Sequence, residues 1–200
     1  MPTELITCPF SWGKNMIGGQ DWQDTYWDDV LRIGQGDGVS SGGEYVSVLK
    51  FDFSPLLTGS IDRIESVNLK MYIMDIHNTV TMNCIGYRIL KNATSLLHWY
   101  KYDGVNNWSS PGAKSAGNDY DPAQLGTREW ASIGYSTMFL SPSVFREMVI
   151  NDRPMVLFSV GVTPPPPEII HTSVTFNKTD HLPYIEVVRR TGVIGGIQIF

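Results

Sequence analysis

The sequence predicts an all-β sandwich that forms a single domain. Apolar residues recur at every second position in several segments, which is the period of a strand with one buried face. Gly- and Pro-rich turn segments separate these runs, and only one stretch has the spacing of a helix. A chain of 200 residues, 42% of them hydrophobic, is long enough for one sizeable core. We therefore expect residues 1–200 to fold as one β-sandwich.

The strand signal is clearest in the middle and at the end of the chain. The side chains that we expect to point inward from these strands are Leu49, Phe51 and Phe53, then Val67, Leu69, Met71 and Ile73, and finally Ile185 and Val187. Residues 155–160 are apolar except for Ser159, which is typical of a central strand covered on both faces. Between residues 80 and 90 the apolar set changes face at Gly86, so we expect a β-bulge or a twist there.

One helix is predicted over residues 141–150. Ser141 is suited to cap it and Pro142 to its first turn. Its apolar stripe consists of Val144, Phe145, Met148 and Val149. We expect Asn151 to end the helix and Pro154 to prevent its continuation.

The segments between these elements have distinct compositions. The glycines of residues 34–43 are typical of a loop or hairpin and do not match a phosphate-binding loop, because no GK[ST] follows. Residues 164–167 are four consecutive prolines, which predict a stiff, extended surface segment. Residues 103–127 are polar and rich in Gly, Asn and Asp. They are too many for an ordinary connection, so we expect a structured, functional loop.

Charge and hydropathy argue against several classes of protein. The net charge is −5 and the fifteen basic residues are scattered, which does not favour nucleic-acid binding. No stretch approaches the ~20 apolar residues of a membrane span. The N-terminus lacks the basic and apolar regions of a signal peptide, so we expect no secretory leader. We expect Cys8 and Cys84 to be reduced, buried thiols, with a disulfide as the less favoured alternative.

The sequence gives little support for catalysis. The four histidines show no metal-ligand spacing such as HExxH, and no GxSxG nucleophile motif is present. Asp180 and His181 are adjacent, but neighbouring residues of a strand point to opposite faces. We therefore expect a protein without enzymatic activity and without a required cofactor.

Several segments resemble a known family. The segments that carry this resemblance are Asp24-Thr25-Tyr26, Leu31-Arg32-Ile33-Gly34, Leu49-Lys50-Phe51-Asp52-Phe53-Ser54, Ile64-Glu65-Ser66-Val67-Asn68-Leu69, Trp108 with Pro111-Gly112-Ala113, Gly117 and Asp119-Tyr120-Asp121, and Phe176 with Leu182-Pro183-Tyr184-Ile185-Glu186-Val187. Their order and spacing over residues 21–188 resemble the DNRLRE domain, which overlaps carbohydrate-binding module family 96. Lys50 and Phe145 depart from that family, where Arg and often Trp stand. The resemblance implies an antiparallel jelly-roll sandwich and, as one function, glycan binding.

Aromatic residues in polar segments are candidates for glycan binding. Sugar rings stack on flat aromatic faces, and neighbouring polar groups bind the hydroxyls. The candidates are Trp22, Trp27, Trp99, Tyr100, Tyr102 and Trp108. The alternative is that these rings fill the ends of the sandwich. In the run from residue 98 to residue 102, strand alternation would expose either Trp99 or the two tyrosines.

A weaker signal concerns calcium. Asp119 and Asp121, with Asp103 as a third ligand, could supply the oxygen ligands that hard cations take from such loops. The alternative is ordinary turn chemistry, in which Asp side chains bond nearby backbone groups.

The C-terminal tail, residues 191–200, predicts assembly. Its sequence TGVIGGIQIF is apolar and uncharged, and such a free segment would tend to aggregate. The assembly residues that we expect are Val193, Ile194, Ile197, Ile199 and Phe200. The alternative is that the tail docks onto its own sandwich.

Two functions follow as expectations. The first is a structural component of a virion, such as a bacteriophage capsid decoration or cement protein, that forms a homo-oligomer, with a trimer as the first guess, and contacts other virion proteins. The second is an extracellular carbohydrate-binding module. Neither function requires nucleic acid or a membrane as a partner.

Overall fold

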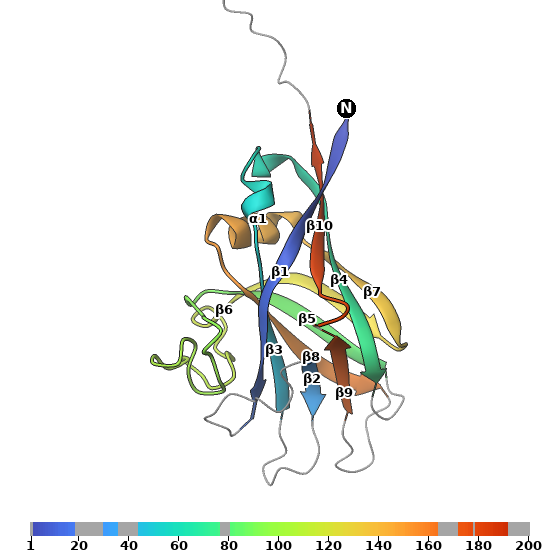
Figure 1. Ribbon diagram of the computed structural model, residues 1–200. Helices are drawn as coiled ribbons and strands as arrows, with labels where there is room; N and C mark the ends of the chain where they lie inside the picture. The colour runs from blue at the N-terminus through green and yellow to red at the C-terminus, as the bar shows by residue number, and fades with distance from the viewer. Residues whose placement is uncertain are drawn as a thin grey trace, which may run out of the picture.

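The computed structural model describes residues 2–18, 30–35, 44–76, 81–163, 172–177 and 179–191 (Figure 1). The strands in these ranges are β1 (Thr3–Ile17), β2 (Val30–Gln35), β3 (Glu44–Phe51), β4 (Ile64–Ile76), β5 (Thr81–Ile89), β6 (Tyr120–Trp130), β7 (Gly134–Leu140), β8 (Met155–Thr163), β9 (Thr172–Asn177) and β10 (Tyr184–Arg190). The helix α1 spans Pro142–Ile150, and two short 3-10 turns, η1 (Ser54–Leu56) and η2 (Ile61–Arg63), precede β4.

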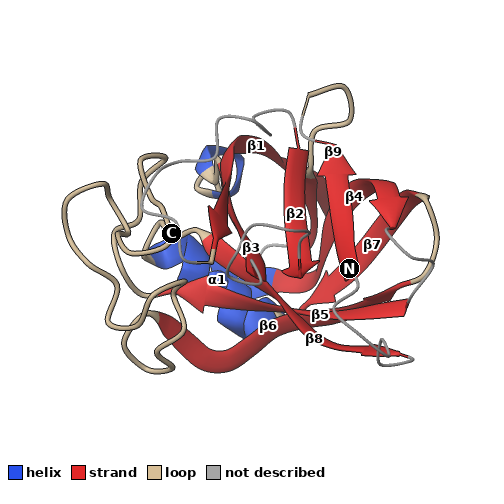
Figure 2. Ribbon diagram, turned by 90° about the horizontal axis from the view of Figure 1, so that it is seen from below, coloured by secondary structure: helices blue, strands red, loops and turns tan. Residues whose placement is uncertain are grey.

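The strands form a closed, antiparallel, jelly-roll-like sandwich. Their order is β1-β10-β4-β7-β6-β5-β8-β3-β2-β9, and additional pairings of β1 with β3 and of β4 with β9 close the sheet on itself. Viewed from below, the strands are arranged around the centre of the molecule (Figure 2), and their inward side chains form the main core. The predicted all-β sandwich is thereby confirmed.

β1 belongs to both sides of the sandwich. Its first half, from Thr3 to Pro9, pairs with β10, and its second half pairs with β3 after a register shift between Phe10 and Trp12. We call β1 (first half), β10, β4 and β7 the first sheet. The second half of β1 with β3, β8 and β5 forms the second sheet.

The alternation that predicted the strands matches the core. Val67, Leu69, Met71 and Ile73 from β4 are buried in the main core with Ile185 and Val187 from β10. β8 is covered on both faces, as expected, because Met155 and Leu157 join the main core and Val156 joins a second cluster. The predicted bulge is also confirmed, since the register of β5 against β6 shifts between Gly86 and Tyr87.

The predicted helix is confirmed, but not its cap. Ser141 precedes α1 and its carbonyl oxygen accepts the Phe145 N–H at 2.9 Å. Its hydroxyl contacts the hydroxyl of Ser143 at 3.0 Å and makes no bond to a backbone N–H of the helix. Phe145, Met148 and Val149 are buried, and the rings of Phe145 and Phe53 meet edge-on at 5.8 Å.

The long loop begins and ends earlier than predicted. β5 ends at Ile89 and β6 starts at Tyr120, so the loop covers residues 90–119 rather than 103–127. The sequence analysis did not predict β6. Leu125 and Trp130 are its only buried residues, and the residues between and before them are mostly polar, so the strand lacks the alternation of apolar and polar residues. The two cysteines are free and buried, which confirms the prediction of two thiols.

Candidate functional site

The loop of residues 90–119 covers the outer face of the second sheet. Leu97, Trp108 and Ala113 from the loop pack with side chains from β1, β3, β5 and β8 into a second buried cluster. The strand residues of this cluster are Met16, Val46, Val48, Ile89 and Val156. The loop therefore has a core of its own and is a structured part of the fold.

Asp119 organises this loop. Its buried carboxylate accepts backbone N–H bonds from Ser109 at 2.7 Å, Ser110 at 2.9 Å and Ser115 at 3.1 Å. The other two predicted calcium ligands lie elsewhere in the hydrogen-bond network. The Asp121 carboxylate accepts the Ala123 N–H and pairs with Arg88 at 2.6 Å.

Asp103 holds a separate turn at the tip of the loop. Its carboxylate accepts the N–H groups of Val105 and Asn106 and the side-chain amide of Asn106. Among the residues that the structure describes, no three acidic, His or Cys side chains group around a common point. The predicted ligand set of Asp103, Asp119 and Asp121 is therefore not assembled. The observed contacts are those of the alternative, turn chemistry.

These contacts shift the pKa values of two of the carboxyls. The N–H of Ala123, followed by the side chain of Arg88, lowers the pKa of Asp121. The side chain and the N–H of Asn106 lower the pKa of Asp103. Hydrogen bonds to the charged form favour it, so both groups stay ionised to lower pH than a free carboxyl.

The predicted aromatic candidates are mostly packed into the loop. Trp108 is buried, donates its Nε1–H to the His98 carbonyl at 3.0 Å and meets the Tyr102 ring edge-on. Trp99 is half-buried, and the ammonium of Lys114 lies 5.2 Å from the centre of its ring. Trp108 is thus part of the buried cluster under the loop, whereas Trp99 and Tyr102 are half-buried and pack against that cluster.

Tyr100 remains the most accessible of the predicted rings that the structure describes, with 38% of its surface exposed. Trp22 and Trp27 lie outside the described residues. The predicted assembly residues Val193, Ile194, Ile197, Ile199 and Phe200 also lie outside them. The structure does describe where the tail begins, because the Thr191 N–H donates to the Pro2 carbonyl at 2.9 Å.

A second candidate region lies on the outer face of the first sheet. Residues that pair directly across neighbouring strands share a face, so the register identifies which side chains point outward. The outward side chains are Thr3, Leu5, Thr7 and Pro9 from β1, Tyr184, Glu186, Val188 and Arg190 from β10, Ser66, Asn68, Lys70 and Tyr72 from β4, and Tyr135, Thr137 and Phe139 from β7. We call this set the uncovered face. The loop of residues 90–119 packs on the second sheet and not on this face, and among the described residues the segment before β10 contacts one end of it through His181.

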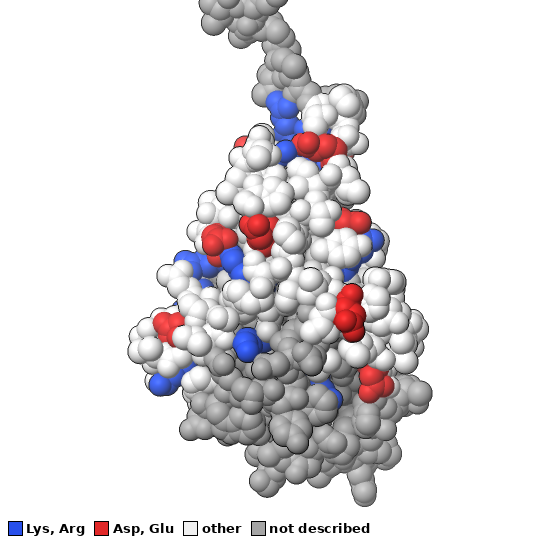
Figure 3. Space-filling model, in the orientation of Figure 1, with Lys and Arg blue, Asp and Glu red and all other residues white. Residues whose placement is uncertain are grey.

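The uncovered face exposes three large apolar or aromatic side chains among polar and charged ones. Tyr135 is 71% exposed, Phe139 69% and Leu5 65%. Lys70 and Glu186 pair with each other at 3.2 Å near the middle of the face. Uncharged surface dominates the view over β1, β10 and β4, interrupted by separate charged groups (Figure 3). Leu5 lies on β1 and the two rings lie on β7, with polar and charged side chains of β10 and β4 between them. Exposed apolar side chains on one face of a sheet are candidate contacts for a partner.

An aromatic group forms one end of the uncovered face. The ring of His181, which follows β9, stacks on Tyr72 with centroids 4.3 Å apart. The Tyr135 hydroxyl lies 3.0 Å from His181 Nδ1, and its ring meets Tyr72 edge-on at 5.0 Å. Tyr135 itself stays largely accessible, so its ring faces solvent while His181 and Tyr72 hold it in place.

Sequence reasoning missed this face. In β7, Tyr135 and Phe139 alternate with Met138 and Leu140, and both sets are apolar. The available signal was this double alternation, which indicates a strand whose outer side is as apolar as its inner side. Such a signal predicts that both faces of the strand are buried, but it does not identify what buries the outer face.

Comparison with protein-family models and with curated sequences finds no relative. No protein-family model matches the chain, and no curated protein sequence matches it. The resemblance to the DNRLRE domain therefore stays a prediction. In the described residues, no helix combines the length and hydropathy needed to cross a bilayer.

Proposed function

We propose that this chain is a non-enzymatic structural protein that works by assembly, as a decoration or cement protein or another surface component of a bacteriophage particle. The observation that carries the proposal is the uncovered face, with Leu5, Tyr135 and Phe139 exposed on one side of the sandwich. A monomer that functioned alone would gain solubility from polar residues at these positions. The proposal makes this face a contact surface with neighbouring protein.

The C-terminal tail supports the same role. Residues 191–200 are uncharged and apolar, and they follow β10, a central strand of the first sheet. A tail that contacts a neighbouring subunit would add a second contact to the one made by the uncovered face. Two linked contacts raise the strength of assembly far above that of either one alone.

The proposal is tested by the native mass of the protein and by its attachment to a particle. We expect the purified chain to be oligomeric, and we expect replacement of residues 191–200 by a Gly/Ser segment of equal length to weaken the oligomer and its attachment. A conservative change outside both contacts, Val105→Thr in the exposed loop, serves as the control. Monomeric behaviour of the wild-type chain, together with failure to sediment with any particle, would contradict the proposal.

A carbohydrate-binding module is the second candidate. The aromatic group of Tyr72, Tyr135 and His181 favours it, because an accessible ring beside polar side chains is the arrangement that stacks a sugar. A glycan array is the direct test. We would expect hits that disappear on Tyr135→Ala or Tyr100→Ala. Trp108→Ala would be uninformative, since Trp108 is part of the core. A blank array would remove this candidate.

A further inference from the structure

We infer that a cleft on the outer side of β5 and β6 binds a short, uncharged saccharide. The cleft has a volume of about 510 Å³ and is lined by Asn83, Cys84, Ile85, Thr127, Arg128 and Glu129. Ligand pockets in proteins commonly hold about 300–1,000 Å³. The inference goes beyond the proposed role in assembly, and it places a saccharide elsewhere than at the aromatic group of the first sheet.

The strand register determines which side chains form the cleft. Asn83 pairs with Glu129 across β5 and β6, and the next pair on the same face is Ile85 with Thr127. Cys84 lies between these pairs and is buried in the main core. Because successive side chains of a strand point to opposite faces, the two pairs on either side of Cys84 point outward. One face thus presents an apolar side chain beside an amide, a hydroxyl and a carboxylate.

The apolar part of the cleft continues into half-buried aromatic rings. Phe158 of β8 pairs with Ile85 on the side away from β6. Tyr87 follows two residues later on β5, and its ring centre lies 6.0 Å from that of Phe158. Both rings pack against the second buried cluster, whereas Ile85 belongs to neither of the clusters that the described residues form. The cover provided by the loop therefore stops short of Ile85, and apolar surface remains beside the cleft.

The protein does not use the polar side chains of the cleft for its own contacts. Within the described ranges, no side-chain hydrogen bond or ion pair involves the polar residues of the cleft, which are Asn83, Thr127, Arg128 and Glu129. Elsewhere on the sandwich, charged groups are bonded to each other, as Arg88 is to Asp121 at 2.6 Å. Four polar side chains that line one hollow without internal partners are available to a ligand.

The charges and the mixture of groups indicate the class of ligand. One guanidinium and one carboxylate line the cleft, so its formal charge is zero and a strongly charged ligand is not favoured. Amide, hydroxyl and carboxylate groups can bond the hydroxyls of a sugar, and an apolar strip can contact the C–H groups of its ring. In the aromatic group, by contrast, the Tyr135 hydroxyl is already bonded to His181. The cleft therefore fits a saccharide better than the aromatic group does.

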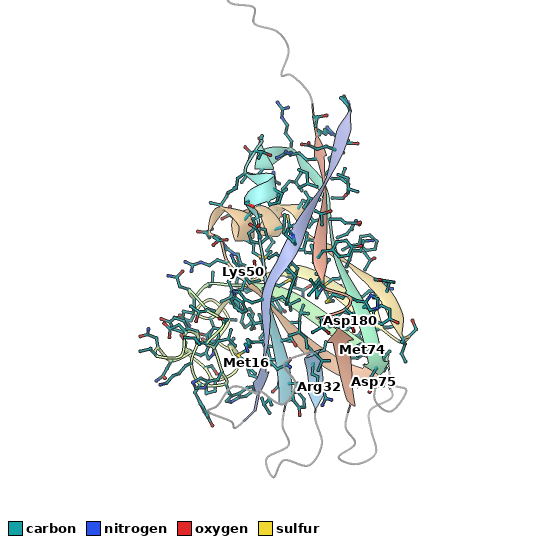
Figure 4. All side chains as sticks on the ribbon, in the orientation of Figure 1. Met16, Arg32, Lys50, Met74, Asp75 and Asp180 are labelled. Atoms are coloured by element: carbon teal, nitrogen blue, oxygen red, sulfur yellow. The ribbon has the colours of Figure 1, made fainter. Side chains whose placement is uncertain are left out.

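The cleft and the aromatic group lie on different sheets, so substitutions can separate them. The cleft is formed by β5 and β6. Asp180, the residue before His181, lies beside Met74 near the end of β4 (Figure 4). The two tyrosines of the aromatic group belong to β4 and β7. A substitution in the cleft therefore leaves the contacts of the aromatic group in place.

A glycan array with the labelled, full-length chain identifies the saccharide, and calorimetric titration of its strongest hit measures the affinity. We expect Asn83→Ala and Glu129→Gln each to bind that hit at least about tenfold more weakly than the wild type, because each loses bonds to hydroxyls. Asn118→Ala removes an exposed amide from the loop and is the matched control, with unchanged affinity. Tyr135→Ala should also bind like the wild type. Circular dichroism and thermal unfolding check that every variant is folded.

Two outcomes would overturn the inference. Wild-type affinity in Asn83→Ala and Glu129→Gln, with loss of binding in Tyr135→Ala, would place the saccharide at the aromatic group instead. A blank array would exclude the cleft as a saccharide site. Neither outcome changes the native mass of the protein or its attachment to a particle, so failure of this inference is distinguishable from failure of the proposed role in assembly.

Discussion

The Asp119 carboxylate accepts the Ser109 N–H at 2.7 Å from a position with no exposed surface. This bond and those from Ser110 and Ser115 tie three points of the loop to the residue that leads into β6. The loop in turn buries apolar residues of β3 and β8. One side chain thus links the local shape of a long loop to the cover of the second sheet.

The first prediction concerns this residue. Asp119→Ala leaves three N–H groups without their acceptor, and each such loss costs about 1–3 kcal/mol when the group stays buried. We expect the free energy of unfolding in urea to fall by roughly 3 kcal/mol or more. Asn118→Ala, which removes an exposed neighbour bonded to the Ser115 hydroxyl, is the control and should have a small effect. Equal effects of the two substitutions would contradict the role of Asp119.

The second prediction concerns acid stability. Hydrogen bonds from Ala123 and Arg88 hold the pKa of Asp121 below its ordinary value, so the folded state binds this proton less readily than the unfolded state. The stabilisation is present above about pH 4 and is lost as the pH falls through the folded-state pKa. Asp121→Asn should therefore flatten the decline in urea midpoint below about pH 4. A decline identical to that of the wild type would show that the Arg88–Asp121 contact does not contribute.

The third prediction concerns the thiols. Burial, with a smaller effect of the nearby Asp52 charge, raises the pKa of Cys8 to about 12. Burial also raises the pKa of Cys84 well above its usual value. Since the thiolate is the reactive form, we expect neither cysteine to react with Ellman's reagent at about pH 8 until denaturant unfolds the chain, after which both should react. Rapid labelling of the native protein would contradict the buried positions of these residues.

The fourth prediction compares two glycines of the loop. Gly112 and Gly117 have left-handed backbones with φ of +75° and +78°, so alanine at either should cost roughly 1 kcal/mol. A Cβ at Gly112 would lie 2.6 Å from the Trp99 ring, whereas nothing lies within 4 Å at Gly117. Gly112→Ala should therefore destabilise the protein by roughly 1–2 kcal/mol more than Gly117→Ala in urea unfolding. Equal losses would show that the Trp99 ring moves aside freely.

Local periodicity was sufficient to predict the elements in which the apolar residues of the sequence are also the buried ones. β4 and β10 alternate cleanly, and the stripe of α1 faces the core as its spacing predicts. Gly86 also marked the bulge, because the apolar set changes face there. In each case, one strand or helix carried the whole signal, and no distant partner was needed to interpret it.

The candidate site could not be predicted in the same way, because it depends on long-range packing. Trp108 lies in a polar segment that suggests exposure, yet side chains of β3 and β8, distant in the sequence, bury it. Tyr135 and Phe139 alternate with equally apolar neighbours, so the residues of β7 do not reveal which side faces the core. The pairing of β4 with β7 determines which side of β7 faces the core. The packing of the loop on the second sheet determines that Trp108 is buried.

Contact between copies of this chain through the uncovered face is tested most directly by sedimentation velocity. The wild type and Phe139→Lys are compared over a dilution series, with Val105→Lys as the control. Val105 is 75% exposed but lies in the loop, away from β7. We predict that the wild type and Val105→Lys associate alike with rising concentration, while Phe139→Lys remains dissociated to higher concentration. Identical behaviour of Phe139→Lys and the wild type would contradict a contact through this face.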